Sequence, residues 1–232
     1  GKLDMWGDLY TTPDEFALLD VGYTAARLCG FMFVPALVAR ISPLRVVQTA
    51  VAVLAGSCLL MASTSHLHPL VFFRVLQGLA GGVVLVGGQS MLFTVFSKES
   101  QPVTQLCFAF GAVVFPATFV SYFQGWMVDT LSWEAIFVTA SGLGAAATLW
   151  LFCLPAKIMA SSGPKRADIP GLLLFSVAAI CLTYIAQEGS RWNWFEADHI
   201  VVMTVCGCAA LLACILRWSF HPRGNGVVAL SV

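Results

Sequence analysis

The chain has 232 residues, of which 59% are hydrophobic and only 10% are charged, with 12 basic and 12 acidic side chains. Ordinary globular chains carry about 25% charged residues, so this composition cannot cover a water-facing surface. It excludes a soluble enzyme, a disordered chain and a secreted disulfide scaffold, and the balanced charge does not indicate nucleic acid as a partner.

Seven apolar segments follow one another along the chain, each about as long as the roughly 20 residues that a membrane-spanning helix needs. We expect the spans at 16–39, 46–64, 69–96, 103–124, 135–155, 169–187 and 200–218. The apolar runs are continuous rather than alternating, which favours helices over a β-barrel. The sequence therefore predicts an all-α membrane protein, a polytopic bundle of seven transmembrane helices.

The expected regions are a polar lead-in at 1–15, a transmembrane bundle at 16–155, a basic linker at 156–168, two further transmembrane helices at 169–218 and a tail at 219–232. Basic side chains gather at alternate joints: Arg40, Arg45, Lys98, Lys157, Lys165, Arg166, Arg217 and Arg223. The other side holds only Lys2 and Arg191. Because short cytoplasmic loops are rich in Lys and Arg, the lead-in is expected outside the cytoplasm, and the linker and tail inside it.

The start of the chain is unusual for a protein with that orientation. It begins with Gly1, and residues 1–15 are polar, without the charged start and apolar core of a signal peptide. We therefore interpret the sequence as a fragment.

Three charged residues fall at bilayer depth, where charges are costly and are functional candidates by default. Asp20 and Arg27 are seven residues apart in the first span and so share a helix face, while Arg74 enters the third span at about the depth of Asp20. Two interpretations of Asp20 stay open. It is either a carboxylate that titrates as its surroundings change, or a permanently paired or interface-directed side chain. Arg27 is a candidate to line a polar cavity.

The third span carries the most informative pattern of small and polar residues. These residues are Arg74, Gln77, Gly78, Gly81, Gly82, Gln89 and Ser90. The first four fall at i, i+3, i+4 and i+7 and so form one stripe, and the run also contains a GxxxG pair that lets another backbone approach closely. The pattern predicts a helix packed inside the bundle beside a wet cavity, although packing alone would explain the glycines.

The cysteines and histidines give no indication of a metal site. All eight cysteines lie in apolar stretches without zinc-binding spacing, so we expect free thiols packed as small hydrophobic groups. The histidines, His66, His68, His199 and His221, are scattered in the joints, and the first two are expected to be solvated. We expect no metal and no cofactor, and an integral-membrane enzyme is the weakest of the function classes.

Several segments match a known family. Arg74-Val75-Leu76-Gln77-Gly78 resembles the R-x-x-Q-G signature of the fourth helix in major facilitator transporters, and Gln89-Ser90 resembles that helix's second polar patch. Further resemblances are Trp133-Glu134-Ala135-Ile136-Phe137 at the sixth helix, Asp168-Ile169-Pro170-Gly171 at the first accessory helix, Trp194-Phe195 after it, and Val227-Val228-Ala229-Leu230-Ser231 before a second bundle. The chain is similar to the fourteen-span drug:proton antiporter, or EmrB-like, branch, which implies a partial major facilitator fold with helices two to eight.

Two motifs of that family are incomplete in this chain. After the first span, where the superfamily reads roughly G-x-x-x-D-R-x-G-[RK], Arg40 and Arg45 are present but the acidic residue and both glycines are lost. In the fifth helix, the G-P-x-x-G-G motif retains only Gly125. We assign Arg40, Arg45 and Gly125 to helix packing and gating, together with Gly78, Gly81 and Gly82.

The resemblance implies a proton-coupled secondary transporter of the bacterial inner membrane, which exports small amphipathic or drug-like molecules by alternating access. It also implies proton coupling by Arg74 and Asp20, and a cavity lined by Arg27, Gln77, Gln89 and Ser90. The implied partners are the substrate, protons, the lipid bilayer and a periplasmic adaptor protein. The alternative is a non-transporting, truncated or degenerate homologue that acts as a membrane scaffold or is an inert fragment.

Overall fold

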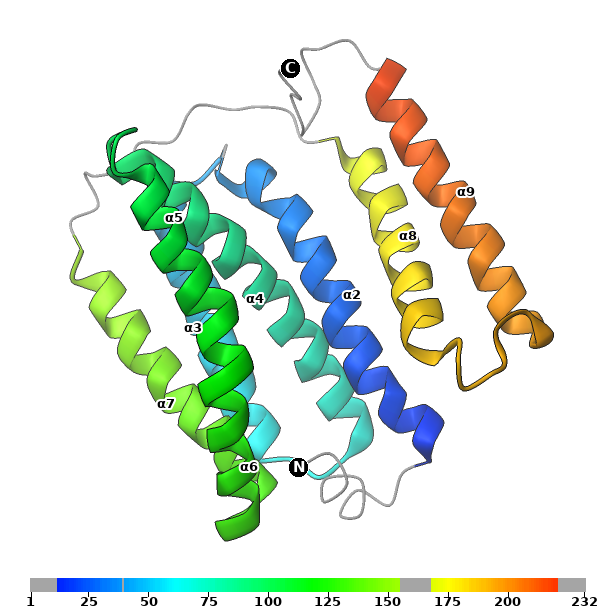
Figure 1. The fold of residues 1–232 in the computed structure, drawn as a ribbon, viewed down its shortest axis with the longest axis horizontal. Helices are drawn as coiled ribbons and strands as arrows, with labels where there is room; N and C mark the ends of the chain where they lie inside the picture. The colour runs from blue at the N-terminus through cyan, green and yellow to red at the C-terminus, as the bar shows by residue number, and fades with distance from the viewer. Residues whose placement is uncertain (1–11, 39, 155–167, 221–232) are drawn as a thin grey trace.

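The computed structural model describes residues 12–38, 40–154 and 168–220, which form long, roughly aligned helices (Figure 1). Most of the expected lead-in and tail lies outside the described residues, and so does the expected linker apart from Asp168. The basic residues of these regions, Lys2, Lys157, Lys165, Arg166 and Arg223, lie outside them as well.

The prediction of seven membrane-spanning helices is confirmed, and no strand occurs in the described part of the chain. The spans are α2 (Pro13–Val38), α3 (Pro43–Ala62), α4 (Leu67–Val95), a composite fifth span (Gln101–Thr130), α7 (Trp133–Phe152), α8 (Ile169–Glu188) and α9 (Asp198–Phe220). Each is long and apolar enough to cross a bilayer.

Helix α2 begins three residues before the span expected from 16 onward. The backbone N–H and the hydroxyl of Thr12 donate to the Glu15 carboxylate at 2.9 and 3.0 Å, and the Glu15 N–H donates back to the Thr12 hydroxyl at 3.4 Å. This reciprocal arrangement is the T-x-x-E capping box, which satisfies backbone donors at a helix start. The polar cap extends the helix beyond its apolar part, so hydropathy alone does not find its beginning.

The helices are arranged around α2 and α4. Helix α4 packs against both α2 and α3, and α7 packs on α3 (Figure 1). On the other side of α2 lies α8, which in turn carries α9. Two clusters of buried apolar residues hold α2, α3 and α4 together: Leu19, Met61 and Leu70 with Trp133 and Phe137 of α7 in one, and Val34, Val46, Ala50 and Val83 in the other.

The GxxxG pair of α4 brings its backbone against that of α2. A Cβ atom on Gly78 would overlap the backbone carbonyl oxygen of Tyr23, and a Cβ atom on Gly82 would overlap that of Arg27. Small residues allow this close approach between membrane helices, where dispersion contacts between backbones supply the attraction. Gly81 plays no such part, because a Cβ atom there would meet only the Tyr23 hydroxyl, at 4.0 Å.

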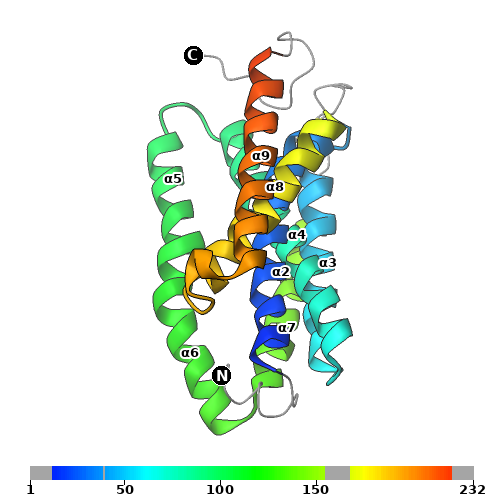
Figure 2. The ribbon, with the colours of Figure 1, turned by 90° about the vertical axis from the view of Figure 1, so that its right-hand side faces the viewer.

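The fifth span is irregular and largely detached. It consists of α5 (Gln101–Ala109), two π-helical turns (Phe110–Val114 and Pro116–Val120) and α6 (Ser121–Thr130). Proline has no N–H to donate to the preceding turn, which explains why regular hydrogen bonding is interrupted around Pro116. Figure 2 shows this rod standing away from the other helices along most of its length, and it contacts α4 at one end and α7 at the other.

A charged clasp joins the two last helices. The Arg217 guanidinium near the end of α9 donates from Nε and Nη2 to the Asp168 carboxylate at 2.8–3.0 Å. The same carboxylate caps α8 by accepting the backbone N–H of Gly171 at 3.2 Å. Because the pair is bidentate and the Asp168 side chain is only 4% exposed, it fixes the start of α8 against the end of α9.

Candidate functional site

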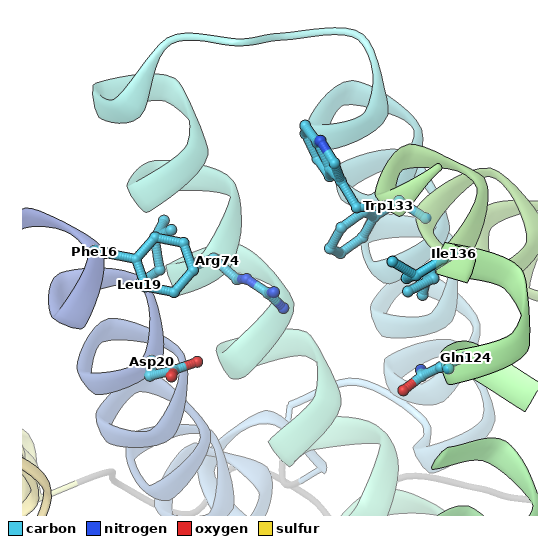
Figure 3. A pocket seen from close by; sticks show the side chains of 10 residues that line it. Phe16, Leu19, Asp20, Arg74, Gln124, Trp133 and Ile136 are labelled. Carbon is cyan, nitrogen blue, oxygen red and sulfur yellow. The ribbon is translucent and has the colours of Figure 1, made fainter. Parts of the chain in front are cut away.

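A pocket of about 300 Å³ lies at one end of the bundle, between α2, α4, α6 and α7. Figure 3 shows Asp20 of α2, Arg74 of α4 and Gln124 of α6 extending toward the same space, with Trp133 and Ile136 of α7 beside it. The complete lining is Phe16, Leu19, Asp20, Arg74, Gln124, Gly125, Val128, Trp133, Ile136 and Phe137. The site therefore combines one acidic group, one basic group and one amide with aromatic and aliphatic walls.

The Arg74 guanidinium lies over two aromatic faces. Its Cζ atom lies 5.0 Å from the ring centroid of Phe137 and 5.9 Å from that of Tyr23. Nη1 donates to the Gln77 side-chain oxygen at 3.3 Å, whereas Nε is buried with no hydrogen-bond partner among the described residues. A desolvated guanidinium over ring faces keeps its charge with only partial compensation.

Asp20 shares the pocket with Arg74, as the comparison of their depths in the sequence suggested. The negative charge of Asp20 stabilises the positive charge of Arg74 electrostatically. Arg27, expected on the same face of α2 as Asp20, does not line this pocket, and its guanidinium lies 6.0 Å from the ring centroid of Phe31. The structure thus brings together the two residues assigned to proton coupling and leaves Arg27 outside.

Gln77 lies outside the pocket, although the sequence places it on the stripe of Arg74. Its side chain is buried between α4 and α3, where Nε2 donates to the Cys58 sulfur at 3.6 Å and the Met61 sulfur at 3.5 Å. Its amide oxygen accepts from Arg74. Gln77 therefore links the site to α3 instead of facing the pocket.

Gln89 and Ser90 lie further along α4, away from the pocket. The Gln89 Nε2 donates to the side-chain oxygen of Gln105 at 3.0 Å and so joins α4 to α5. The backbone carbonyl of Ser90 accepts the Thr94 hydroxyl at 2.9 Å. These contacts give Gln89 a role between helices, and neither residue belongs to the wall of this pocket.

The residues assigned to packing and gating fall into separate places. Gly78 and Gly82 form the close contact with α2, whereas Gly81 has room for a side chain. Gly125 lines the pocket, and no atom lies within 4 Å of a Cβ built on it. Arg40 and Arg45 are exposed at the joint between α2 and α3.

Sequence reasoning missed the α7 wall of the site and the clasp of the last two helices. Trp133 and Phe137 are four residues apart, so they lie on one face of α7, and both are buried. The W-E-A-I-F segment was the available signal, but it indicated only where a helix begins. Asp168 had a signal as well, because an Asp directly before Ile-Pro-Gly is typical of a helix N-cap.

Three relatives show what the chain is similar to. It is 25% identical over 227 residues to the probable multidrug resistance protein EmrY of Escherichia coli K12, across 97% of this chain and 44% of EmrY. It is 27% identical over 170 residues to the multidrug export protein EmrB of Haemophilus influenzae, across 72% of this chain and 32% of EmrB. It is 29% identical over 194 residues to the putative multidrug resistance protein MdtD of Cronobacter sakazakii, across 80% of this chain and 38% of MdtD.

The chain spans less than half the length of each of these relatives. The family model of the Major Facilitator Superfamily matches residues 2–219, which is nearly all of the sequence. The match includes all seven helices, the last of them up to Ser219, together with the Arg74 segment and every residue that lines the pocket. On this match, the chain belongs to the major facilitator superfamily, whose members are membrane transporters and not enzymes.

Proposed function

We propose that this chain is part of a proton-coupled secondary transporter that exports small amphipathic or drug-like molecules. The observation that carries the proposal is the meeting of Asp20 and Arg74, from two helices long and apolar enough to span a membrane, in one pocket. Ionisable groups inside a membrane are costly, so a carboxylate and a guanidinium that share a cavity are candidates for ion coupling. The names of the relatives, multidrug export and multidrug resistance proteins, support the substrate class.

We propose that proton coupling acts through the electrostatics of the pair. When Asp20 is ionised, it attracts Arg74 and favours the arrangement in which both face the pocket. When Asp20 takes up a proton, this attraction is lost and Arg74 is free to reorient or to accept another partner. A protonation step of this kind gives the two states of an alternating-access cycle different stabilities.

The walls of the pocket fit substrates that are recognised mainly by apolar contact, with few directed hydrogen bonds. Phe16 and Trp133 offer aromatic surface, and Gln124 offers an amide that donates and accepts hydrogen bonds. A mixed wall of this kind accepts apolar molecules that carry a few polar groups.

We further propose that the protein lies in a bacterial inner membrane with Arg40 and Arg45 on the cytoplasmic side and Arg191 outside, following the positive-inside rule. The pocket then lies toward the extracytoplasmic end of the bundle, where external protons have access. From the resemblance to the EmrB-like branch we also propose a periplasmic adaptor as a partner, and Arg40, Arg45 and Gly125 remain proposed gating residues.

The test is transport by the protein expressed at its full natural length, carrying Arg74→Ala. Uptake of a fluorescent cationic dye into everted vesicles is measured under an imposed pH gradient. We expect transport to fall to the level of vesicles that lack the protein, with near-normal membrane insertion. Arg191→Ala, which removes an exposed arginine outside the pocket, is the control and should retain transport. Transport at the unaltered rate in Arg74→Ala would refute the coupling role, whereas absence of transport by the unaltered protein would favour a non-transporting homologue.

A further inference from the structure

The Arg74 guanidinium requires something to hold it in place, because its contacts with hydrogen-bond acceptors are few. One amide oxygen, that of Gln77, accepts from Nη1 at a long 3.3 Å, and Nε is buried without a hydrogen-bond partner in the described part of the chain. The nearest group that compensates the charge through its face is the ring of Phe137, at 5.0 Å. The second ring, that of Tyr23, is farther away at 5.9 Å.

The Phe137 ring is itself held rigidly. It is 9% exposed and belongs to the buried cluster with Leu70 and Met61. Trp133 packs edge-on against it, with ring centroids 6.1 Å apart and an interplanar angle of 78°. Packing of this kind fixes the place of the ring beside the pocket, and the attraction of its face for a cation favours the position of the guanidinium over it.

We propose that Phe137 is a positioning residue for Arg74: its aromatic face holds the guanidinium in the pocket, at the place from which Arg74 acts on Asp20. A ring quadrupole attracts a cation more weakly than a carboxylate does, so Arg74 keeps its charge available. The consequence for transport rests on the proposed coupling role of Arg74, whereas the positioning itself rests on the geometry alone.

The pair also connects two different helices. Arg74 lies on α4 and Phe137 lies on α7, and both helices pack on α3. A displacement of α7 relative to α4 therefore moves the ring from under the guanidinium. The contact thus makes the position of Arg74 sensitive to the arrangement of the helices around the pocket.

The experiment changes the ring's electrostatics and leaves its shape almost unaltered. Mono-, di- and trifluorinated phenylalanine are introduced at position 137, which weakens the attraction of the ring face for a cation step by step. The rate at which phenylglyoxal modifies Arg74 is followed by peptide mass spectrometry in the full-length protein. We expect this rate to rise with each fluorine, by about threefold or more across the series, as the guanidinium is released.

The same series at Phe73 is the matched control, because Phe73 packs against the same cluster, whereas the described rings over which the Arg74 guanidinium lies are those of Phe137 and Tyr23. Its fluorination should leave the modification rate of Arg74 unchanged. Phe137→Leu, which removes the aromatic face, should raise the rate of Arg74 modification. Phe137→Tyr, which keeps the face, should leave the rate at the value of the unaltered protein, provided that both variants insert normally. An equal rate of Arg74 modification across the Phe137 fluorination series would overturn the proposal.

Transport measured on the same variants separates this inference from the proposed function. If the rate of Arg74 modification rises while transport falls, both the positioning by Phe137 and the coupling role of Arg74 stand. If modification rises and transport stays unchanged, Phe137 positions Arg74 but Arg74 does not couple protons. If modification stays flat while Arg74→Ala abolishes transport, the coupling role stands and the positioning by Phe137 is wrong.

Discussion

Two arginines of this chain are stabilised in different ways, and the difference fits their locations. Arg217 forms a bidentate ion pair with Asp168 at the edge of the bundle, where the Arg217 side chain is 30% exposed. Arg74 lies in a pocket and relies on ring faces, one amide and the field of Asp20. A bidentate pair fixes geometry, whereas a guanidinium over aromatic rings stays available to a competing carboxylate. The first arrangement suits a structural clasp and the second suits a site.

The clasp leads to a prediction that separates its two functions. Asp168→Asn keeps an N-cap acceptor for Gly171 but removes the charge that binds Arg217, whereas Asp168→Ala removes both. We expect the thermal unfolding midpoint in detergent to be lower for Asp168→Asn than for the unaltered protein, and lower still for Asp168→Ala. The second decrease reflects the loss of the N-cap, which contributes about 1 kcal/mol to stability. Because Arg217 is partly exposed, high salt should narrow the difference between wild type and Asn. Equal midpoints for all three proteins would contradict the clasp.

At the scale of elements, the contact of α2 with α4 depends on two glycines in register. Gly78 and Gly82 face the carbonyl oxygens of Tyr23 and Arg27, four residues apart on α2, so the backbones run closely side by side for a full turn. Sequence analysis predicted the GxxxG contact but assigned Gly81 to packing as well. One stripe of a helix can face two neighbours, since residues three apart differ by about 60° around the axis. For the same reason Arg74 faces the pocket while Gln77 faces α3.

This contact gives a prediction with an internal control. Gly78→Ala and Gly82→Ala should each destabilise the helix pair by about 1–3 kcal/mol, because the added methyl group forces two backbones apart. Gly81→Ala should be neutral or slightly stabilising, since space is available and alanine favours a helix. The measurement is the denaturant midpoint in mixed micelles for the three variants. If Gly81→Ala lowered the denaturant midpoint as much as Gly78→Ala, the close contact between α2 and α4 would not lie at Gly78 and Gly82.

At the scale of the whole molecule, the number and type of the spans could be predicted because the cost of unpaired backbone in lipid leaves only helices and closed barrels. The continuous apolar runs of this chain then favour helices over a barrel. The neighbours of each helix could not be predicted. The α6 and α7 walls of the pocket arise because the short turn after Thr130 folds α7 back onto α3, and no pattern of residues indicates that choice. The sequence indicated only that Asp20 and Arg74 lie at a similar depth, while Phe137, Trp133 and Gln124 entered the site only through tertiary packing.

The orientation of the whole molecule rests on the distribution of basic residues, and it is open to a direct test. With the eight native cysteines replaced, single cysteines are placed at two exposed joints, Ser97→Cys between α4 and α5 and Ser190→Cys after α8. Because Lys98 lies beside the first and the basic side of a membrane protein faces the cytoplasm, we expect an impermeant maleimide to label only Ser190→Cys in intact cells. Ser97→Cys should react once the membrane is opened. The reverse pattern would invert the molecule, place the Asp20–Arg74 pocket at the cytoplasmic end and reverse the side from which its proton arrives.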